Sequence, residues 1–236
     1  MVLLRHLSNF TDFNVLERDE RVNLYYTNNT DELAKADIIL LPGTKSTLDD
    51  LYELRRNGVA HAILEARRNG ATVMGICGGY QMMGQVVSDP EGIEGSLRSL
   101  PGLGLLPVET VMEGEKVTRR LNFSFPSCAD NRCTGYEIHQ GRTVPAEGEE
   151  QRTFIQTSEG RKDGWMADRK CFGTYIHGIL DNQAVIDWLL EPYADKLQKT
   201  VLDYSAYKEE QYDKLAAHVR SHLNLSLLYQ ILTTHD

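Results

Sequence analysis

The sequence contains few cysteines and no long apolar run, and each absence excludes a class of protein. Its 236 residues include four cysteines, no two of which have the CxxC spacing of a zinc or redox site. No apolar stretch approaches the roughly 20 residues that cross a bilayer, and residues 1–6 lack the pattern of a secretory signal. We therefore expect a cytoplasmic protein with no disulfide framework, no metal site and no membrane partner.

A cluster of basic residues is also missing. The formal net charge is −9, and the pairs Arg55-Arg56, Arg67-Arg68 and Arg119-Arg120 are isolated from one another. An acidic chain without a basic patch has little attraction for phosphate backbones, so we expect no nucleic-acid partner. The apolar fraction of 41% is sufficient for a real core in one large domain, with room for a helical appendage.

What the chain does have is an alternation of strands and helices. Apolar or β-prone runs predict strands at residues 22–26, 37–41, 71–76 and 171–176. Helical patterns cover residues 47–56, 59–69, 79–87, 183–190 and 205–232, the last with a break near Asn224. Residues 104–107, 116–125, 135–139 and 153–156 form short β-like runs in a glycine-rich middle. We expect an α/β fold with a mostly parallel central sheet flanked by helices, an antiparallel extension and a C-terminal helix.

The most informative motif is Gly75-Ile76-Cys77-Gly78-Gly79-Tyr80-Gln81, directly after a predicted buried strand. A cysteine between glycines at a strand-to-helix turn is typical of a nucleophile elbow. The amides at the start of the next helix favour the thiolate, and the Gly78 amide is free to donate to an oxyanion. The alternative is a buried structural cysteine. The other cysteines, Cys128, Cys133 and Cys171, lack such a setting.

A thiolate that attacks an amide needs a partner that protonates the leaving amine. His177 follows the predicted strand at residues 171–176 and lies 100 residues beyond Cys77. We predict that it is the catalytic base. The turn after residues 37–41 contains Gly43, whose amide is the predicted second oxyanion donor, because loops at the carboxyl ends of strands line one crevice. An ordinary turn that caps the next helix is the alternative for Gly43.

The motif around Cys77 resembles the nucleophile motif of class I glutamine amidotransferases. This resemblance implies that Cys77 attacks the side-chain amide of glutamine and forms a γ-glutamyl thioester, and that His177 is the catalytic histidine. It also implies that Gln81 helps to hold the substrate. Many members have a glutamate two residues after the histidine, but this sequence has Ile179 there. Asp181 is a weak substitute because a helix cap explains it equally well.

Four segments narrow the resemblance to the C-terminal glutaminase region of the cobyric acid synthase family; they are residues 8–13, 41–47, 135–143 and 173–178. The likeness covers nearly all of residues 1–236, which we interpret as one glutaminase domain. It implies ATP-dependent amidation of adenosylcobyrinic acid a,c-diamide in cobalamin biosynthesis. The sequence has no GxxxxGKS or GxxxxGKT phosphate-binding loop. We therefore expect ATP and Mg to bind to a separate N-terminal synthetase domain, which also holds most of the corrinoid. No cofactor is expected in this chain.

Some interpretations stay open. Tyr136 and His139 either line the glutamine pocket, face the synthetase partner or hold His177, and we favour a role in substrate binding. The same Cys/His pair also fits the glutaminase of a related amidotransferase that acts on cobyrinic acid or a cell-wall lipid precursor. A catalytically silent interaction module and a cysteine peptidase or γ-glutamyl hydrolase are further alternatives.

Overall fold

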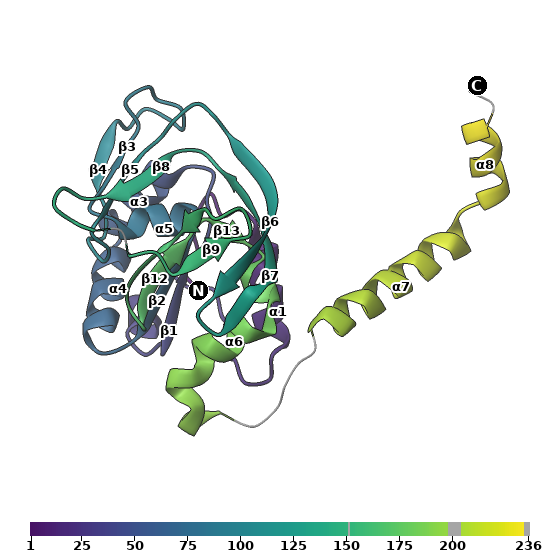
Figure 1. Ribbon diagram of the computed structural model, residues 1–236, viewed down its shortest axis with the longest axis horizontal. Coiled ribbons are helices and arrows are strands. Elements are labelled where there is room, and N and C mark those ends of the chain that lie inside the picture. Colours follow the sequence, from purple (N-terminus) through teal and green to yellow (C-terminus); the bar gives the residue numbers. More distant parts are fainter. Residues whose placement is uncertain (151, 198–203, 234–236) are drawn as a thin grey trace. The chain divides into compact units, whose positions relative to one another are not determined.

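The computed structural model describes residues 1–150, 152–197 and 204–233, apart from the side chains of residues 129–131 and 205. The chain divides into two compact units, Met1–Lys199 and Thr200–Asp236 (Figure 1). All strands of the described residues, and every residue predicted above to form the site, belong to the first unit.

A four-stranded sheet in the order β1-β2-β12-β11 forms the centre of the first unit. Its strands are Ile38–Leu41 (β1), Thr72–Ile76 (β2), Cys171–Thr174 (β12) and Trp165–Asp168 (β11). The first three run parallel and β11 is antiparallel to β12. Since Leu41 and Thr174 lie level with Gly75 and Ile76 of β2, the loops that follow these strands meet at one edge of the sheet.

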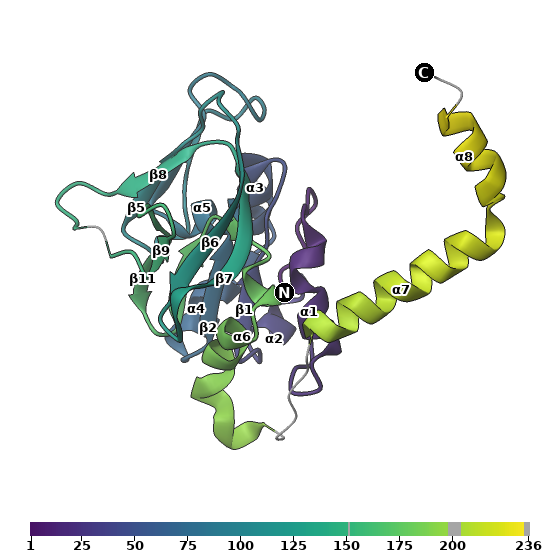
Figure 2. The same cartoon turned by 45° about the vertical axis from the view of Figure 1, so that its right-hand side comes forward.

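Helices cover the central sheet, with α4 on one flank and α1 on the other (Figures 1 and 2). Their bounds are Asn14–Arg18 (α1), Thr30–Leu33 (α2), Thr47–Arg56 (α3), Val59–Arg68 (α4), Gly78–Met83 (α5) and Gln183–Leu190 (α6). Three 3-10 segments span Phe10–Phe13 (η1), Ile179–Asp181 (η2) and Glu191–Lys196 (η3). The predicted helices at 47–56, 59–69 and 183–190 are confirmed, and Gly58 (φ 83°) permits the turn between the first two.

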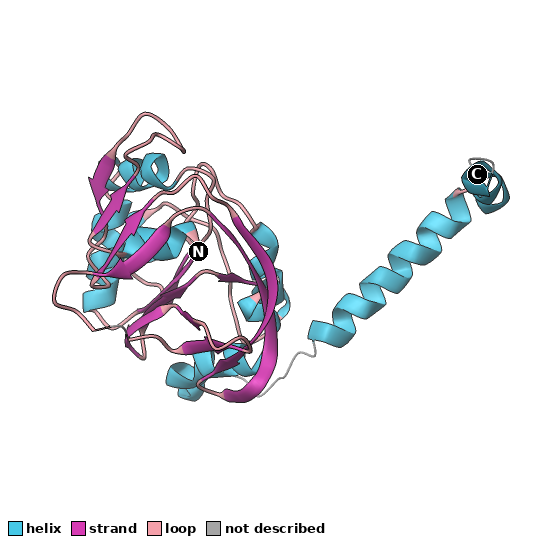
Figure 3. Cartoon of the chain, turned by 45° about the horizontal axis from the view of Figure 1, so that its top comes forward, coloured by secondary structure: helices cyan, strands magenta, loops and turns pink. Residues whose placement is uncertain are grey.

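The middle of the chain contributes most strands of two further sheets (Figure 3). One has the order β10-β9-β6-β7-β13 and comprises Lys162–Asp163, Ile155–Thr157, Val117–Phe125, Cys128–His139 and Ile176–His177. The other has the order β4-β3-β5-β8 and comprises Ser99–Pro101, Val86–Ser88, Val108–Val111 and Arg142–Pro145. The predicted antiparallel extension is therefore confirmed for the first of these sheets, whereas in the second β3 runs parallel to β5.

The predicted strand at 171–176 is broken at Tyr175, so that His177 joins a different sheet from Cys171. Buried Asp163 holds the break: its carboxylate accepts from the Thr174 hydroxyl, and its Oδ2 lies 3.3 Å from the Tyr175 amide. The Ile176 amide donates to Thr174 Oγ1 at 3.1 Å. These side-chain acceptors replace strand partners at the bend, and β13 pairs with β7 instead.

Three local predictions were wrong. The helix after Cys77 ends at Met83, because Gln85 donates its amide to Val108 O at 2.7 Å and residues 86–88 pair with β5. Residues 104–107 are bends that precede β5, and residues 22–26 form no strand. Near the latter, Thr27 makes an isolated bridge to Val2. Short β-prone runs acquire strand structure only where a partner strand is available.

The second unit contains α7 (Tyr204–His222) and α8 (Leu225–Thr233). The predicted break is confirmed, because Asn224 Oδ1 accepts from the Leu227 amide at 3.1 Å and caps the start of α8. Large apolar side chains of these helices are exposed, among them Tyr212, Leu215, Leu228 and Leu232. Within the described residues, no helix has both the length and the apolar character that a membrane span requires.

Candidate active site

Cys77 lies in the sharp turn between β2 and α5. Its φ of 52° and ψ of −114° fall in a region that non-glycine residues rarely adopt. The amides of the first turn of α5 follow the cysteine directly, and the Cys77 amide itself donates to Thr174 O at 2.9 Å. Strain of this kind persists only where the surroundings hold it in place, and it is frequent at catalytic residues. The backbone is that of a nucleophile elbow.

The glycines that flank Cys77 are required by close packing. A Cβ at Gly75 would lie 2.6 Å from Met83 Sδ, and one at Gly79 would lie 2.0 Å from Leu41 O. The turn therefore presses against both its own helix and the end of β1. Only residues without a side chain fit at these two positions.

His177 comes to the same edge of the sheet from β13, where it is level with Tyr136 of β7. The imidazole is 1% exposed. Its Nε2 has no hydrogen-bond partner in the part of the chain that the structure describes, while Cys77 is close enough to act on its pKa. The structure thus places the predicted nucleophile and base on the same side of the sheet.

Asp12 orients the imidazole. Its Oδ2 lies 2.6 Å from His177 Nδ1, and its Oδ1 accepts from the Gly178 amide at 2.9 Å. Asp12 belongs to η1 and is 2% exposed. A carboxylate that accepts from Nδ1–H leaves Nε2 to exchange a proton with a nucleophile. Cys77, His177 and Asp12 are therefore the candidate catalytic triad.

The charge of His177 follows from this arrangement. Burial lowers the pKa of His177, but the hydrogen bond that Nδ1 donates to Asp12 and the neighbouring Cys77 outweigh burial and raise the pKa to about 9. Near neutral pH the ring is then an imidazolium between two anionic or polarisable partners. An imidazolium beside a thiolate is the state in which a proton is ready for a leaving amine.

The sequence did not identify Asp12 as part of the site, although it lies in the segment 8–13 that supported the family resemblance. It is 165 residues from His177 in the chain, and no spacing rule links the two. Ile179, at the position where many relatives carry glutamate, is fully buried. The only sequence feature that pointed to Asp12 was an acidic residue between Thr11 and Phe13. Such a residue alone does not predict a buried carboxylate.

The two glycines predicted to form the oxyanion hole lie next to the triad. A Cβ at Gly43 would lie 3.2 Å from His177 Cε1, and one at Gly78 would lie 2.5 Å from Thr44 Cγ2. The loop after β1 therefore touches both the histidine and the start of α5. Their roles as donors remain predictions, and this proximity is consistent with them.

The other predicted site residues take separate positions. Gln81 is 2% exposed, and its Nε2 donates to Gln140 O at 2.9 Å and to the Tyr175 hydroxyl at 3.2 Å. His139 stacks on Tyr175 with ring centroids 3.8 Å apart. Tyr136 stacks on His177 at 5.3 Å. Gln81 and His139 line the pocket at Cys77, whereas Tyr136 covers the imidazole. Substrate binding by all three remains a prediction.

A pocket of about 270 Å³ opens at Cys77. Its lining combines polar, charged and apolar side chains: Ser8, Asn9, Thr44, Lys45, Cys77, Gln81, Glu94, Lys116, Ile138, His139 and Gln140. The volume suits a single amino acid. Among the described residues, no group of three or more His, Cys, Asp or Glu residues could hold a metal ion.

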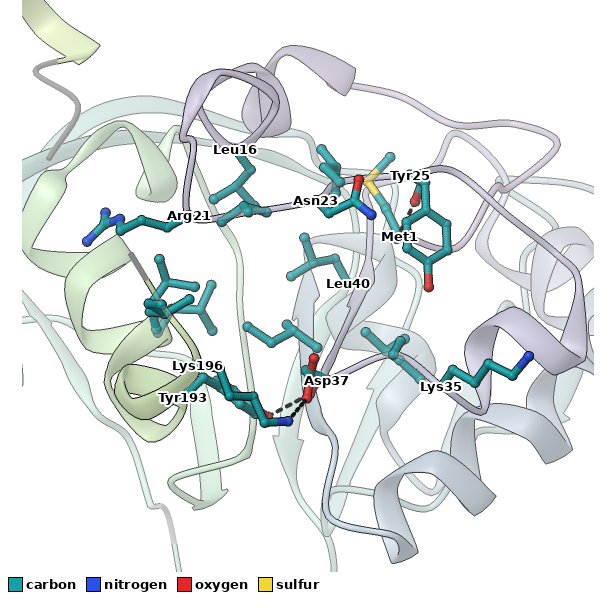
Figure 4. Close-up of a pocket in the computed structure, with 18 of the residues that line it drawn as sticks. Met1, Leu16, Arg21, Asn23, Tyr25, Lys35, Asp37, Leu40, Tyr193 and Lys196 are labelled. Atoms are coloured by element: carbon teal, nitrogen blue, oxygen red, sulfur yellow. Dashed lines mark hydrogen bonds and ion pairs between the residues drawn. The ribbon is translucent and has the colours of Figure 1, made fainter. Parts of the chain in front are cut away.

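A larger cavity of about 380 Å³ lies away from the cysteine, beside the start of β1 (Figure 4). Two of its cationic side chains are paired. Lys196 Nζ is 2.7 Å from Asp37 Oδ1, and Arg21 pairs with Asp19 and Asp187. Because the lining of this cavity includes no cysteine, serine or histidine, the pocket at Cys77 is the candidate active site.

Solved structures of known proteins share this fold. A solved glutamine amidotransferase aligns with a TM-score of 0.58 at 13% identity, covering 80% of this chain and 96% of the other. PurLQS from Thermotoga maritima aligns with a TM-score of 0.61 at 19% identity, covering 81% and 96%. At these identities the likeness shows the fold, which is that of glutamine amidotransferases.

The sequence itself narrows the class. A family model described as the CobB/CobQ-like glutamine amidotransferase domain matches residues 1–185, so the chain belongs to this family of enzyme domains. It is 70% identical to a cobyric acid synthase of Phocaeicola vulgatus and 67% identical to one of Bacteroides fragilis, in each case over 100% of this chain and 48% of the relative. The chain thus spans about half the length of the curated relatives it matches.

Proposed function

We propose that this chain hydrolyses glutamine to glutamate and ammonia. The observation that carries the proposal is the connected set of a strained Cys77, a buried His177 with a free Nε2, and Asp12 bound to Nδ1. The family supports the substrate class. The proposal explains why a histidine, an aspartate and a cysteine from distant segments converge at one edge of the sheet.

In the first half of the reaction, Cys77 Sγ attacks the carbon of the substrate's side-chain amide. A C–S bond forms and the carbonyl electron pair moves to oxygen, which in this proposal accepts from the amides of Gly43 and Gly78. When the carbonyl re-forms, the C–N bond breaks, and the His177 imidazolium transfers its Nε2 proton to the departing nitrogen. Ammonia leaves and a γ-glutamyl thioester remains.

In the second half, neutral His177 accepts a proton from water, and the oxygen attacks the thioester carbon. The C–S bond then breaks, glutamate is released, and the thiolate–imidazolium pair is restored. Asp12 keeps the same proton on Nδ1 throughout, so that Nε2 alone exchanges protons. Stacking of Tyr136 on the imidazole limits its rotation.

We further propose that the ammonia serves a second reaction in a longer protein. The relatives named cobyric acid synthase are about twice as long as this chain. In the proposed protein, a synthetase half uses ATP and Mg to activate carboxylates of adenosylcobyrinic acid a,c-diamide, and holds most of that corrinoid. The present chain supplies the nitrogen, and its two partners are glutamine and the synthetase half.

Glutamine labelled with nitrogen-15 in the side-chain amide tests the first proposal. We expect labelled ammonia from the wild-type chain, assayed alone and with the synthetase half of a relative, and none from Cys77→Ala. Cys171→Ala is the matched control, because Cys171 is buried in the core and lies outside the pocket. Equal ammonia release by the wild type and Cys77→Ala would contradict the proposal.

A further inference from the structure

The pocket at Cys77 carries charges of both signs. Glu94 lies in its wall together with Lys45 and Lys116. Free glutamine is a zwitterion, with an ammonium and a carboxylate on the same carbon, whereas a glutamine residue within a peptide has neither charge. The charges in this pocket can therefore distinguish free glutamine from a glutamine residue within a peptide.

The carboxylate of Glu94 is fixed in place by the backbone. Asp89, which is fully buried, accepts from the amides of Ile93 and Glu94 at 2.8 and 2.9 Å. Glu94 Oε2 in turn accepts from the Thr47 amide at 2.6 Å, at the start of α3. The segment 89–94 thus holds this carboxylate against the helix and the pocket.

Glu94 shares the Thr47 hydroxyl with another acceptor. That hydroxyl has a single hydrogen, but Gln81 Oε1 lies 3.0 Å and Glu94 Oε1 lies 3.3 Å from Thr47 Oγ1. Gln81 cannot turn away, because its Nε2 is committed to Gln140 O and the Tyr175 hydroxyl. The hydroxyl cannot donate to both oxygens at once, so Glu94 Oε1 competes for it and can accept from a further donor.

Within the described residues, no lysine, arginine or histidine makes an ion pair with Glu94. Burial raises the pKa of Glu94, and the hydrogen bonds from Thr47 and from the Leu48 amide oppose this only in part. A bound cation stabilises a half-buried carboxylate that has no ion-pair partner, because its charge offsets the cost of desolvating the carboxylate.

We propose that Glu94 binds the α-ammonium of glutamine and restricts the pocket to free amino acids. The ammonium carries three donors and a positive charge, which suit the carboxylate of Glu94. Lys45 and Lys116 provide positive charge for the α-carboxylate. This inference rests on the proposed function, because it assumes that glutamine occupies the pocket. In this proposal Glu94 determines specificity through the α-ammonium of the substrate and does not contact the side-chain amide that reacts.

A purely structural role for Glu94 as a cap of α3 makes a different prediction. Glutamine at position 94 keeps an oxygen that accepts from the Thr47 amide, so that Glu94→Gln preserves the cap and removes only the charge. Glu91→Gln is the matched control, since Glu91 is an exposed carboxylate three residues earlier and lies outside the pocket. Thermal unfolding of both variants establishes that each is folded.

The experiment measures the rate at which Cys77 is alkylated by two probes, a diazoketone analogue of glutamine and the same compound acetylated on its α-nitrogen. In the wild type we expect the free-amine probe to react roughly 10- to 100-fold faster, the effect of one charge-assisted hydrogen bond. In Glu94→Gln this preference should fall to a few-fold, whereas Glu91→Gln should retain it.

The outcomes separate the two proposals. If Glu94→Gln slows both probes equally, or leaves the preference of the wild type intact, Glu94 does not bind the ammonium, although glutamine hydrolysis stands. If the free-amine probe fails to label Cys77 in the wild type while iodoacetamide does label it, the proposed function itself fails. Iodoacetamide carries no ammonium and reports only whether the thiolate is reactive.

Discussion

Replacing Asp12 with asparagine tests the triad most closely. The carboxylate has two oxygens, and each accepts from one donor: Oδ2 from His177 Nδ1 and Oδ1 from the Gly178 amide. Asparagine has nearly the same shape but only one acceptor oxygen. One of the two donors must then face an NH₂ group. Because the site is buried, the unsatisfied donor destabilises the fold by about 1–3 kcal/mol.

The effect on catalysis is larger than the effect on folding. The pKa of His177 is raised from 6.5 to about 9, which is roughly 3 kcal/mol in favour of the imidazolium at ~1.4 kcal/mol per pKa unit. Asp12 is the first of the groups that raise it. We expect Asp12→Asn to lower kcat by about 10²- to 10³-fold, with little change in KM, since Asp12 does not line the pocket.

The pH dependence has a definite sign. Because the pKa of His177 is higher in the folded protein, protonation of this residue stabilises the fold. The contribution is complete below about pH 6.5 and is lost as the pH rises through about 9. Activity that needs the imidazolium should decline over the same upper range. Without the Asp12 charge, only Cys77 opposes the effect of burial on this pKa, and both alkaline transitions should move to lower pH.

Initial rates of glutamine hydrolysis between neutral and alkaline pH, with thermal unfolding over the same range, measure both effects. Asp181→Asn is the matched control, because Asp181 is a second aspartate close to His177 in the chain, in η2, whereas the carboxylate at His177 Nδ1 is that of Asp12. An Asp12→Asn profile that coincides with the wild type, or an equal shift in Asp181→Asn, would refute the assignment of Asp12 as the orienting group.

Three other substitutions follow from the same geometry. Gly79→Ala should prevent stable folding or lower the free energy of unfolding by more than about 2 kcal/mol, since its Cβ would lie 2.0 Å from Leu41 O. Gly114→Ala is the control: its Cβ would have no atom within 4 Å, so the free energy of unfolding should change little. Tyr136→Phe should keep most of kcat because the ring that stacks on His177 remains, whereas Tyr136→Ala should lower kcat. Equal values of kcat for the two variants would contradict the proposal that the ring limits rotation of the imidazole. Burial raises the pKa of Cys171 to about 11, so limited alkylation near neutral pH should modify Cys77 first, and prior labelling of Cys171 would contradict this.

Much of the fold could be predicted from local patterns. The continuous apolar runs at 37–41 and 71–76 identified β1 and β2, and the glycines at 58 and 70 marked the ends of α3 and α4. These signals are local, because burial on both faces and helix termination depend on nearby residues. The break at Tyr175 was missed, since it depends on Asp163, which arrives from β10 and reads as an ordinary acidic residue.

The site residues also differ in whether the sequence could predict them. Cys77 and the glycines around it could be recognised because the elbow is contained in seven consecutive residues. Asp12 and Glu94 could not, since their roles come from burial beside His177 and Gln81, which only the assembled sheets create. Gln81 shows the converse: its position was predicted, but the structure reveals how Gln140, Tyr175 and Thr47 hold it.

The covalent intermediate offers the most direct test of the account. Wild-type chain mixed with glutamine and quenched rapidly in acid should carry one γ-glutamyl group, and peptide mapping by mass spectrometry should place it on Cys77. His177→Ala should reduce the amount formed. A glutamyl group on another cysteine, or glutamine hydrolysis that proceeds undiminished in Cys77→Ala, would contradict the account.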